Sequence, residues 1–347
     1  MSVKTDRLRL KAVCVISLIT MMEKRPVLAL LVLLLFCPQP ASAQEGDCHH
    51  RILPLTVLDS RGRLVQGLTA ADFQAKFHGK PVQIISIQPD KRPRRIVILL
   101  DASGSMRDVW SSARSIAGHI LDARLPNTSF AFLLFSNRVI EQVRFGQGVE
   151  AIRSLLQRIG EDPKHLKEIV RGHTALLDSI VEALRLFDPQ DSSDSLYVIT
   201  DAGENASRAG MREVLRALLS SGVRLHLICL SQATRYRPTP EEVRGPNDMD
   251  DLVKATGGLS FGAIYESWAH SGGSAEQEAR VLADLGRMNE GILNSWRIEI
   301  ELPESSARLL EWELQPSPNK KEDFKGAKLL YPHRLAACGA AENHPHN

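Results

Sequence analysis

The fold of this chain is decided by one stretch, RRIVILLDASGSM, which spans Arg94–Met106. A continuous apolar run ends there in a carboxylate, two hydroxyls and a glycine, and a helical pattern of apolar residues follows at once. This profile is typical of a buried parallel strand that opens into a loop at its C-terminal end. Ligands of open α/β sheets bind at that edge of the sheet. The oxygen-bearing side chains of the loop favour a hard cation such as Mg²⁺ or Mn²⁺.

Strands and helices alternate from this stretch to Leu302. Strands are predicted at Ile96–Leu100, Ser129–Phe135, Arg138–Phe145, Leu196–Asp201, Leu225–Leu230, Leu259–Ile264 and Trp296–Leu302. Helices are predicted from about Met106 to Leu121 and at Val149–Ile159, Thr174–Phe187, Met211–Leu219, Met249–Ala255 and Ala275–Leu293, with a polar loop before Thr174. This alternation predicts an α/β fold with a doubly wound, mostly parallel sheet, Rossmann-like, covered by helices on both faces.

Short β segments flank the α/β region on both sides. About forty residues before Pro89 and two segments after Pro303, at Leu309–Leu314 and Ala327–Tyr331, have this character. Each set is too small for a core of its own, so we expect segments from both ends to pack together as a small accessory module. The expected organisation is a signal peptide at 1–43, a β-rich segment with linker at 44–93, the α/β domain at 94–302, β segments at 303–338 and a disordered tail at 339–347.

The N-terminus has the pattern of a secretory signal. The basic segment Met22–Arg25 precedes ten apolar residues, Val27–Phe36, and an A-x-A-like site ends at Ala43. We expect cleavage after Ala43 and export to the periplasm, the cell envelope or the medium. The apolar core is shorter than the roughly 20 residues that span a bilayer. An uncleaved signal anchor is the alternative, and membrane contact is expected only in that case.

Cysteine usage agrees with export. The mature chain would keep Cys48, Cys229 and Cys338. Cys229 lies in an apolar strand and is expected to be a buried free thiol. Cys48 and Cys338 lie near the two mature ends, and an oxidising compartment would allow them to form a disulfide. That pairing is a hypothesis.

The composition gives no case for a nucleic-acid or anionic-membrane partner. The 347 residues are 43% hydrophobic and 24% charged, with a formal net charge of +2. These values are typical of a globular protein. A nearly neutral chain gives no reason to expect a nucleic-acid partner.

Oxygen ligands occur at three points of the pattern. They are Asp101, Ser103 and Ser105 in the opening stretch, Thr174 at a helix start, and Asp201 at a strand end. In a doubly wound sheet these residues meet above one edge. If the three hydroxyls contact the ion and the two carboxylates act partly through water, a bound Mg²⁺ keeps unneutralised positive charge, which favours an acidic ligand from outside. The alternative is a set of Asx and Ser turns that cap the following helix.

The same segments resemble a known family. Asp101–Ser105 resembles the D-x-S-x-S signature of von Willebrand factor type A (VWFA) domains, and Gly172–Asp178 and Ile199–Asp201 are similar to the second and third metal-binding segments of that fold. The resemblance covers residues 94–302. One departure is Ala202, where many members have glycine. Val65–Leu68 with the following Asp72-Phe73 also resembles the region before this domain in exported bacterial proteins of the acidobacterial type.

The resemblance implies a metal-ion-dependent adhesion site (MIDAS). Ser103, Ser105 and Thr174 would bind Mg²⁺ or Mn²⁺ directly, and Asp101 and Asp201 mainly through water. The implied function is divalent-cation-dependent protein binding or cell adhesion, in which the ion binds an Asp or Glu of an unidentified partner protein. The neighbouring His173 is expected at the rim of the site.

Other functions fit the sequence less well. A metal-dependent phosphotransferase-like enzyme would have D-x-D at the first strand end, and residue 103 is serine. A serine hydrolase would place Ser103 in G-x-S-x-G. A scaffold partner of an AAA-type ATPase would be cytoplasmic, against the signal sequence. We therefore expect no enzyme activity.

Overall fold

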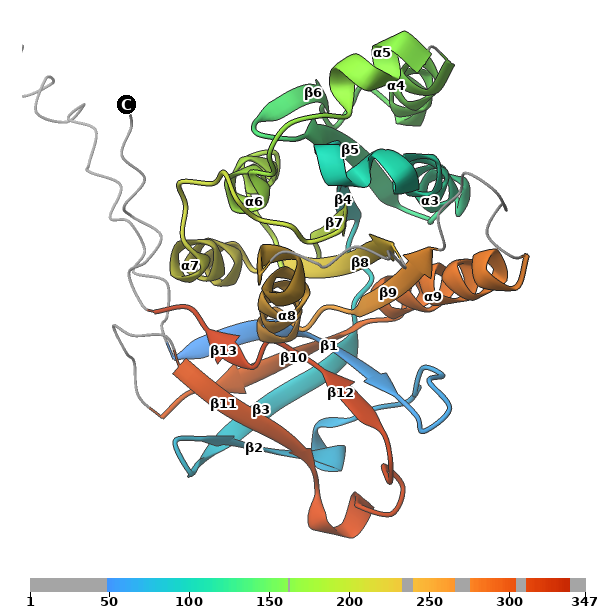
Figure 1. The fold of residues 1–347 in the computed structure, drawn as a ribbon. Coiled ribbons are helices and arrows are strands. Elements are labelled where there is room, and N and C mark those ends of the chain that lie inside the picture. The colour runs from blue at the N-terminus through green and yellow to red at the C-terminus, as the bar shows by residue number, and fades with distance from the viewer. Residues whose placement is uncertain (1–48, 162, 233–239, 266–274, 304–309, 338–347) are drawn as a thin grey trace, which may run out of the picture. The chain divides into compact units, whose positions relative to one another are not determined.

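The computed structural model describes residues 49–161, 163–232, 240–265, 275–303 and 310–337 (Figure 1). The expected signal peptide, the hypothetical Cys48–Cys338 pair and the expected C-terminal tail lie outside the described residues. Within these ranges, every helix is too short or too polar to span a bilayer.

A six-stranded sheet contains the opening stretch of the sequence. Its strand order is β6-β5-β4-β7-β8-β9. Every neighbouring pair is parallel except β5 and β6, so the sheet is mixed, with one antiparallel edge strand. The bounds are β4 (Arg94–Asp101), β5 (Thr128–Phe135), β6 (Val139–Val143), β7 (Ser195–Thr200), β8 (Arg224–Gln232) and β9 (Ser260–Tyr265).

Helices cover both faces of this sheet (Figure 1). One face packs against α3 (Trp110–Asp122), α4 (Val149–Glu161) and α9 (Ala275–Leu293), and the other against α6 (Leu176–Leu184), α7 (Met211–Ser221) and α8 (Pro240–Ala255). The β4 side chains explain this, because Ile96, Ile98 and Leu100 belong to one core and Val97 and Leu99 to the other. A strand buried on both faces has to be apolar at every position.

Two helices differ from the sequence-based expectation. Helix α5 (Pro163–Ile169) occupies the expected polar loop, since Leu166 and Ile169 supply enough apolar surface to pack on the α4 side. Helix α8 begins nine residues before the expected Met249. Its first half contains Gly245 and Pro246 and lacks apolar spacing, so no pattern predicted it.

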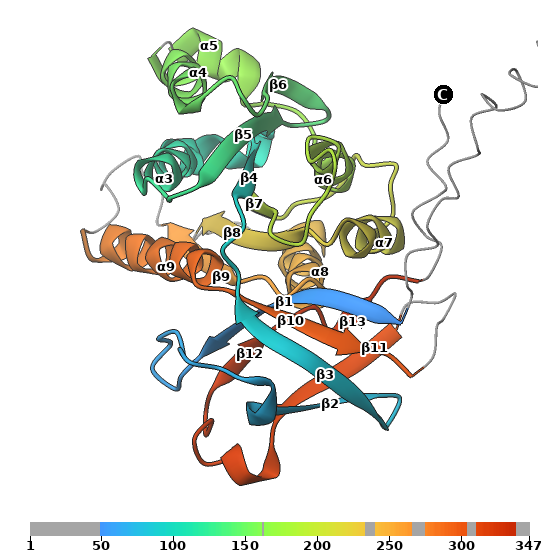
Figure 2. The same ribbon diagram turned by 180° about the vertical axis from the view of Figure 1, so that it is seen from behind.

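The flanking segments form a second sheet of seven antiparallel strands, larger than the small module that we expected (Figure 2). Its order is β12-β1-β10-β3-β2-β11-β13. The two ends of the chain pair directly, because β1 pairs with β12 and β2 with β11. The bounds are β1 (His50–Leu58), β2 (Phe73–Phe77), β3 (Lys80–Pro89), β10 (Trp296–Glu301), β11 (Leu310–Pro316), β12 (Lys328–Leu330) and β13 (Arg334–Leu335), with short 3₁₀ helices η1 (Ala70–Asp72) and η3 (Pro318–Lys320).

Strand β10 corrects the expected domain boundary. We placed it in the parallel sheet, but it pairs with β1 and β3. Its side chains alternate, with Trp296, Ile298 and Ile300 buried and the residues between them more exposed. Such alternation is typical of an antiparallel sheet that buries one face, which explains why β10 belongs there.

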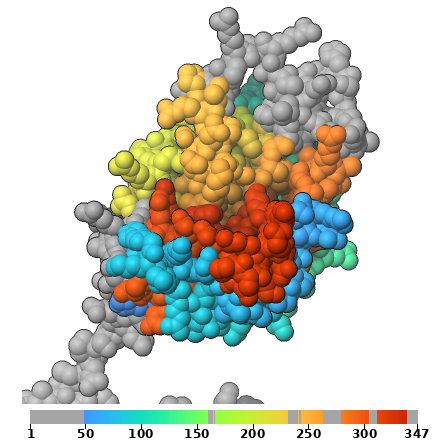
Figure 3. All heavy atoms as spheres, turned by 90° about the horizontal axis from the view of Figure 1, so that it is seen from below, coloured from blue at the N-terminus to red at the C-terminus, as the bar shows by residue number. Residues whose placement is uncertain are grey.

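Buried polar contacts join the two sheets. The Thr56 hydroxyl of β1 donates to the Gly291 carbonyl of α9 at 3.1 Å. The fully buried Arg224 lies 3.4 Å from the Thr56 hydroxyl. Figure 3 views the side formed by the seven-stranded sheet, where segments from both ends of the described chain lie together.

Candidate metal site

Asp101 ends β4 and is fully buried. One carboxylate oxygen accepts the Ser103 amide at 2.7 Å, and the other accepts the Thr200 hydroxyl at 2.6 Å. Both contacts come from strand ends at the same edge of the sheet. The carboxylate is therefore held in one orientation by its own loop and by β7.

The two serine hydroxyls of the first loop are neighbours. Ser103 Oγ and Ser105 Oγ lie 3.1 Å apart. Ser103 is fully buried, whereas Ser105 is exposed at the start of η2 (Gly104–Val109). The loop thus leads from a buried aspartate through a buried serine to an exposed serine.

The loop before α6 packs against this first loop. The Gly104 amide donates to the Gly172 carbonyl at 3.0 Å, and the Arg171 amide donates to the Ala102 carbonyl at 3.0 Å. A side chain at Gly104 would meet the Gly172 carbonyl at 3.3 Å, so the close approach favours glycine. These contacts place the buried Thr174 beside the serine loop, and the neighbouring His173 is exposed.

Asp201 follows β7 and lies close to Thr174. The Gly203 amide donates to Asp201 Oδ1 at 3.1 Å. A methyl group at Gly203 would lie 3.3 Å from Asp201 Oδ1 and 3.9 Å from Thr174 Oγ1. Both oxygens therefore border the same small space, which a side chain at residue 203 would fill.

The electrostatics of the edge favour a cation. Burial, and secondly the charge of Asp201, raise the pKa of Asp101 to about 7. Burial and the Asp201 charge likewise raise the pKa of the Cys229 thiol, which is free, to about 11. A carboxylate close to a second carboxylate is costly to ionise, and a cation between them removes that cost.

The donor set fits a hard divalent ion. It consists of two carboxylates and three hydroxyls, all oxygen donors of the type that Mg²⁺ prefers. No group of three or more His, Cys, Asp or Glu side chains is arranged for a metal in the part of the chain that the structure describes. The ligand roles of Asp101, Ser103, Ser105, Thr174 and Asp201 stay predictions.

Four supporting residues were missed by the sequence analysis. Thr200 fixes Asp101, and Asn205 accepts the Thr174 amide at 2.9 Å. Glu204 accepts the Leu177 amide at 2.9 Å, at the N-terminus of α6. The fourth is Gly245 of α8, where a side chain would overlap the Ala202 carbonyl. Asn205 and Glu204 act on residues 31 and 27 positions away, so no local pattern could have found them.

Ala202 has left-handed backbone geometry, with φ of 62°. Many VWFA domains, the family that these segments resemble, have glycine at this position. It is fully buried, and a side chain at Gly245 would overlap its carbonyl oxygen. The third loop therefore has an alanine in a conformation that glycine adopts at less cost, held by the backbone of α8.

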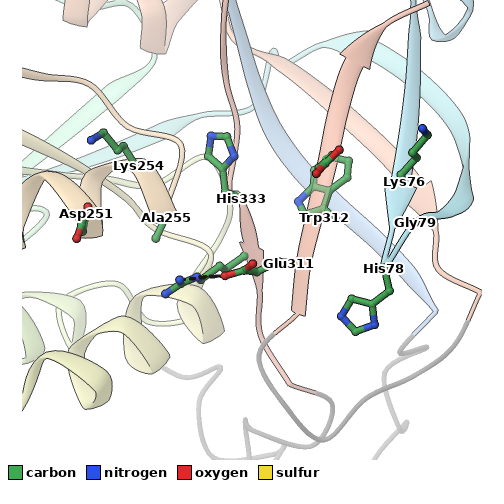
Figure 4. Close-up of a pocket in the computed structure, with 11 residues that line it drawn as sticks. Lys76, His78, Gly79, Asp251, Lys254, Ala255, Glu311, Trp312 and His333 are labelled. Atoms are coloured by element: carbon green, nitrogen blue, oxygen red, sulfur yellow. Dashed lines mark hydrogen bonds and ion pairs between the residues drawn. The ribbon is translucent and has the colours of Figure 1, made fainter.

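A separate cleft of about 730 Å³ lies beside the seven-stranded sheet (Figure 4). The end of α8, strands β11 and β13 and the β2–β3 hairpin line it. Its charges are mixed: Lys76 and Lys254 line it, and Arg334 forms an ion pair with Glu311. None of the five predicted metal ligands lies in it, so it is distinct from the candidate site.

Comparisons with known proteins find similar solved structures and one matching family. Similar solved structures include the conserved hypothetical protein BatB from Bacteroides thetaiotaomicron, with 19% identity over 56% of this chain and 98% of that one and a TM-score of 0.40. A von Willebrand factor type A structure from Catenulispora acidiphila has 12% identity over 85% of this chain and 75% of the other, with a TM-score of 0.41. The pilus adhesin SpaC from Lactobacillus rhamnosus GG has 11% identity over 71% and 46%, with a TM-score of 0.40.

A search of the curated proteins finds no match. The family described as "VWA domain containing CoxE-like protein" matches residues 72–257. The matched region includes β4 through α8, with all three loops of the candidate site. Because the match covers more than half of the chain, the protein belongs to this family of VWA-domain proteins, which suggests a protein-interaction module.

Proposed function

We propose that the chain is an exported, divalent-cation-dependent protein-binding module that binds an acidic residue of a partner. The observation that carries this proposal is the buried Asp101 carboxylate, whose pKa is raised to about 7 by burial and by Asp201. The hydroxyls of Ser103, Ser105 and Thr174 accompany the two acids, and Ser105 is an exposed residue. A cation there would be reachable from outside.

Ser103, Ser105 and Thr174 would hold Mg²⁺ or Mn²⁺ directly, and Asp101 and Asp201 mainly through water. The bound ion would supply an open coordination position for a carboxylate. The chain's own residues prepare the site. Thr200 and the Ser103 amide orient Asp101, and Glu204 and Asn205 hold the third loop against α6.

The rival functions lack a comparable observation. A phosphotransferase-like mechanism needs a second carboxylate in the first loop, and Ser103 stands at that position. The alternative of a scaffold partner for an ATPase requires that the protein stay in the cytoplasm. A reporter fused behind residues 1–48 separates it from the proposal, because a cytoplasmic reporter would favour the scaffold.

Metal binding is the direct test. We expect the Ser105→Ala and Thr200→Val variants to bind Mg²⁺ or Mn²⁺ about 10–100-fold more weakly than wild type in calorimetric titrations, because each removes a ligand or the group that orients one. Ser60→Ala, at an exposed turn far along the chain, is the matched control. Unchanged affinity in both site variants would contradict the metal site.

Partner binding is tested separately. A pull-down from the envelope fraction should capture a protein in Mg²⁺, lose it in chelator, and lose it with Ser105→Ala but not with Ser60→Ala. Capture that resists both chelator and Ser105→Ala would refute the cation-dependent mechanism.

A further inference from the structure

One arginine is buried where the two sheets meet. Arg224 begins β8, and only 2% of its surface is exposed. Its guanidinium lies 3.4 Å from the Thr56 hydroxyl of β1 and 3.4 Å from the Ser295 hydroxyl next to β10. Its Nε has no hydrogen-bond partner among the residues that the structure describes. Long contacts to neutral hydroxyls offset little of the cost of burying a positive charge, which needs an opposite charge nearby.

The aspartates at this end of the parallel sheet are paired with other arginines. Arg92 donates to both oxygens of Asp90, at 2.9 and 2.6 Å, and to Asp191 at 2.6 Å. Arg95 donates to both oxygens of Asp194, at 3.0 and 2.6 Å. Within the described part of the chain, no carboxylate forms an ion pair with the buried guanidinium of β8.

The C-terminus of α9 accounts for the other buried arginine at this end of the sheet. The Arg94 guanidinium donates to the carbonyls of Ile292 and Leu293, at 3.1 and 2.8 Å, where the helix has the negative end of its dipole. Burial lowers the pKa of Arg224 to about 10 despite the nearby Asp90, so this group stays charged at neutral pH. Four arginines therefore accompany three aspartates here, and the excess positive charge is that of β8: Arg92, Arg94, Arg95 and Arg224, with Asp90, Asp191 and Asp194.

Two neighbours of Arg224 carry polar atoms that also lack a partner. Ser195 lies opposite Arg224 in the register of β7 and β8, and His226 lies two residues further along β8 on the same face. Among the described residues, neither the Ser195 hydroxyl nor His226 Nε2 has a hydrogen-bond partner, and both are buried. Burial, and secondly Arg224, keep the pKa of His226 low and the ring neutral, and its Nδ1 accepts the Leu259 amide, so the ring proton belongs on Nε2. The cluster therefore offers three donors and no acceptor.

We propose that a small monovalent anion such as chloride binds at this cluster as the counter-ion of Arg224, with Ser195 and His226 as further donors. An anion offsets the buried charge, whereas a water molecule only satisfies the donors. The site is separate from the candidate metal site, because it lies at the N-terminal ends of β7 and β8 and Asp201 follows the C-terminal end of β7. Since Arg224 also contacts β1, the anion would stabilise the contact between the two sheets.

Thermal unfolding of the full chain tests the inference. It is measured at neutral pH with chelator, in sodium chloride and in sodium gluconate of equal ionic strength, since gluconate is much larger than chloride. We expect chloride to raise the unfolding midpoint of the wild type in a saturable way, by about 2–5 °C at roughly tenfold over its dissociation constant. Arg224→Met should abolish this shift. Ser195→Ala, which loses no protein hydrogen bond, should weaken chloride binding about tenfold. Arg216→Met, which removes an exposed arginine of α7, is the control and should keep the full shift.

Bromide soaked into crystals gives a direct readout, because bromide scatters anomalously. An anomalous peak within hydrogen-bond distance of Arg224 in the wild type, absent from Arg224→Met, supports the site. Equal midpoints in chloride and gluconate, or a chloride shift that persists in Arg224→Met, overturn it. If Arg224→Met does not fold, Ser195→Ala decides, and an unchanged chloride affinity there overturns the site. A peak without any shift of the midpoint means an adventitious ion only, and density without anomalous signal means water; either result overturns the proposal.

Discussion

The two sheets of this protein bury their side chains in opposite ways. In β4 of the six-stranded sheet, every residue but Arg95 is buried, whereas β10 of the seven-stranded sheet alternates. A sheet covered by helices on both faces favours apolar side chains along the middle of its strands, and the candidate ligands of the first sheet lie at the strand ends. The second sheet has a solvent-facing side and carries charges along its length, such as Glu299 and Arg297.

Matched core truncations test whether the two sheets unfold as one unit. Phe132 and Phe77 are fully buried, one in each sheet. We expect Phe132→Ala and Phe77→Ala each to lower the free energy of unfolding by about 3–5 kcal/mol, because each leaves a large cavity. Since buried contacts join the sheets, both should shift the same transition in urea, followed by circular dichroism and by tryptophan fluorescence. Two separate transitions would show that the join is weak.

A methyl group at Gly245 should damage the parallel sheet's edge selectively. It would overlap the Ala202 carbonyl, so α8 or the third loop has to move. We expect Gly245→Ala to lower the free energy of unfolding by about 3 kcal/mol, at the upper end for overpacking, and to weaken Mg²⁺ binding. Gly286→Ala, where nothing lies within 4 Å, is the control in α9. Equal stability of the two variants would contradict the contact between α8 and Ala202.

The acid sensitivity of two histidines gives another comparison of the two sheets, because one lies in the six-stranded sheet and the other next to the seven-stranded sheet. Burial, and secondly Arg224, hold the pKa of the buried His226 in β8 well below its usual value, and partial burial lowers the pKa of the more exposed His333 next to β13. Below pH 6.5 the unfolded chain binds a proton that the folded His226 does not, so stability falls as pH falls, by up to about 1.4 kcal/mol per pH unit.

The measurement is urea unfolding between pH 6.5 and 5.0. His226→Gln keeps an acceptor for the Leu259 amide, which His226 Nδ1 now accepts at 3.1 Å. The His226→Gln substitution should reduce the loss of unfolding free energy between pH 6.5 and 5.0 by about 2 kcal/mol. The His333→Gln substitution should reduce it by less. A steeper or unchanged profile in His226→Gln would show that this imidazole is protonated in the folded protein.

The smallest effect is expected at Ala202. Glycine there would relieve about 1 kcal/mol of left-handed strain, but glycine also costs about 0.5–1 kcal/mol in unfolded-state entropy. Ala202→Gly should therefore change the free energy of unfolding by less than about 0.5 kcal/mol. Thermal unfolding checks this, with Ala123→Gly, at an exposed helix end, as a comparison. A large loss of stability would mean that the buried methyl packs more tightly than its backbone strain costs.

The sequence predicted the α/β region better than its surroundings. Continuous apolar runs such as β4 and β7 were placed correctly, because burial on both faces leaves an unambiguous pattern. Asp101, Thr174 and Asp201 could be assigned to one edge, since parallel strands end together. The strand that was misplaced, β10, looked like a neighbour of α9 along the chain, and its true partners β1 and β3 lie more than two hundred residues earlier.

Long-range backbone contacts account for the rest. Glu204 and Asn205 contribute through hydrogen bonds to another loop, and Gly245 through the space that it leaves empty. None of these three residues belongs to a motif with a fixed spacing or a periodic pattern along the chain. Such residues can be identified only once the loops are placed next to each other.

The pairing of β1 with β12 and of β2 with β11 has a consequence for how this protein is made. Its seven-stranded sheet cannot form completely until β11 and β12 have been synthesised, because β1 pairs with β12 and β2 pairs with β11. Such non-local pairing is slow to form. A chain cut after Leu302 would leave the edges of β1 and β2 unpaired, and open strand edges recruit other chains. Expression of the isolated α/β region together with β1–β3 should therefore yield aggregates, and any useful fragment has to retain both ends.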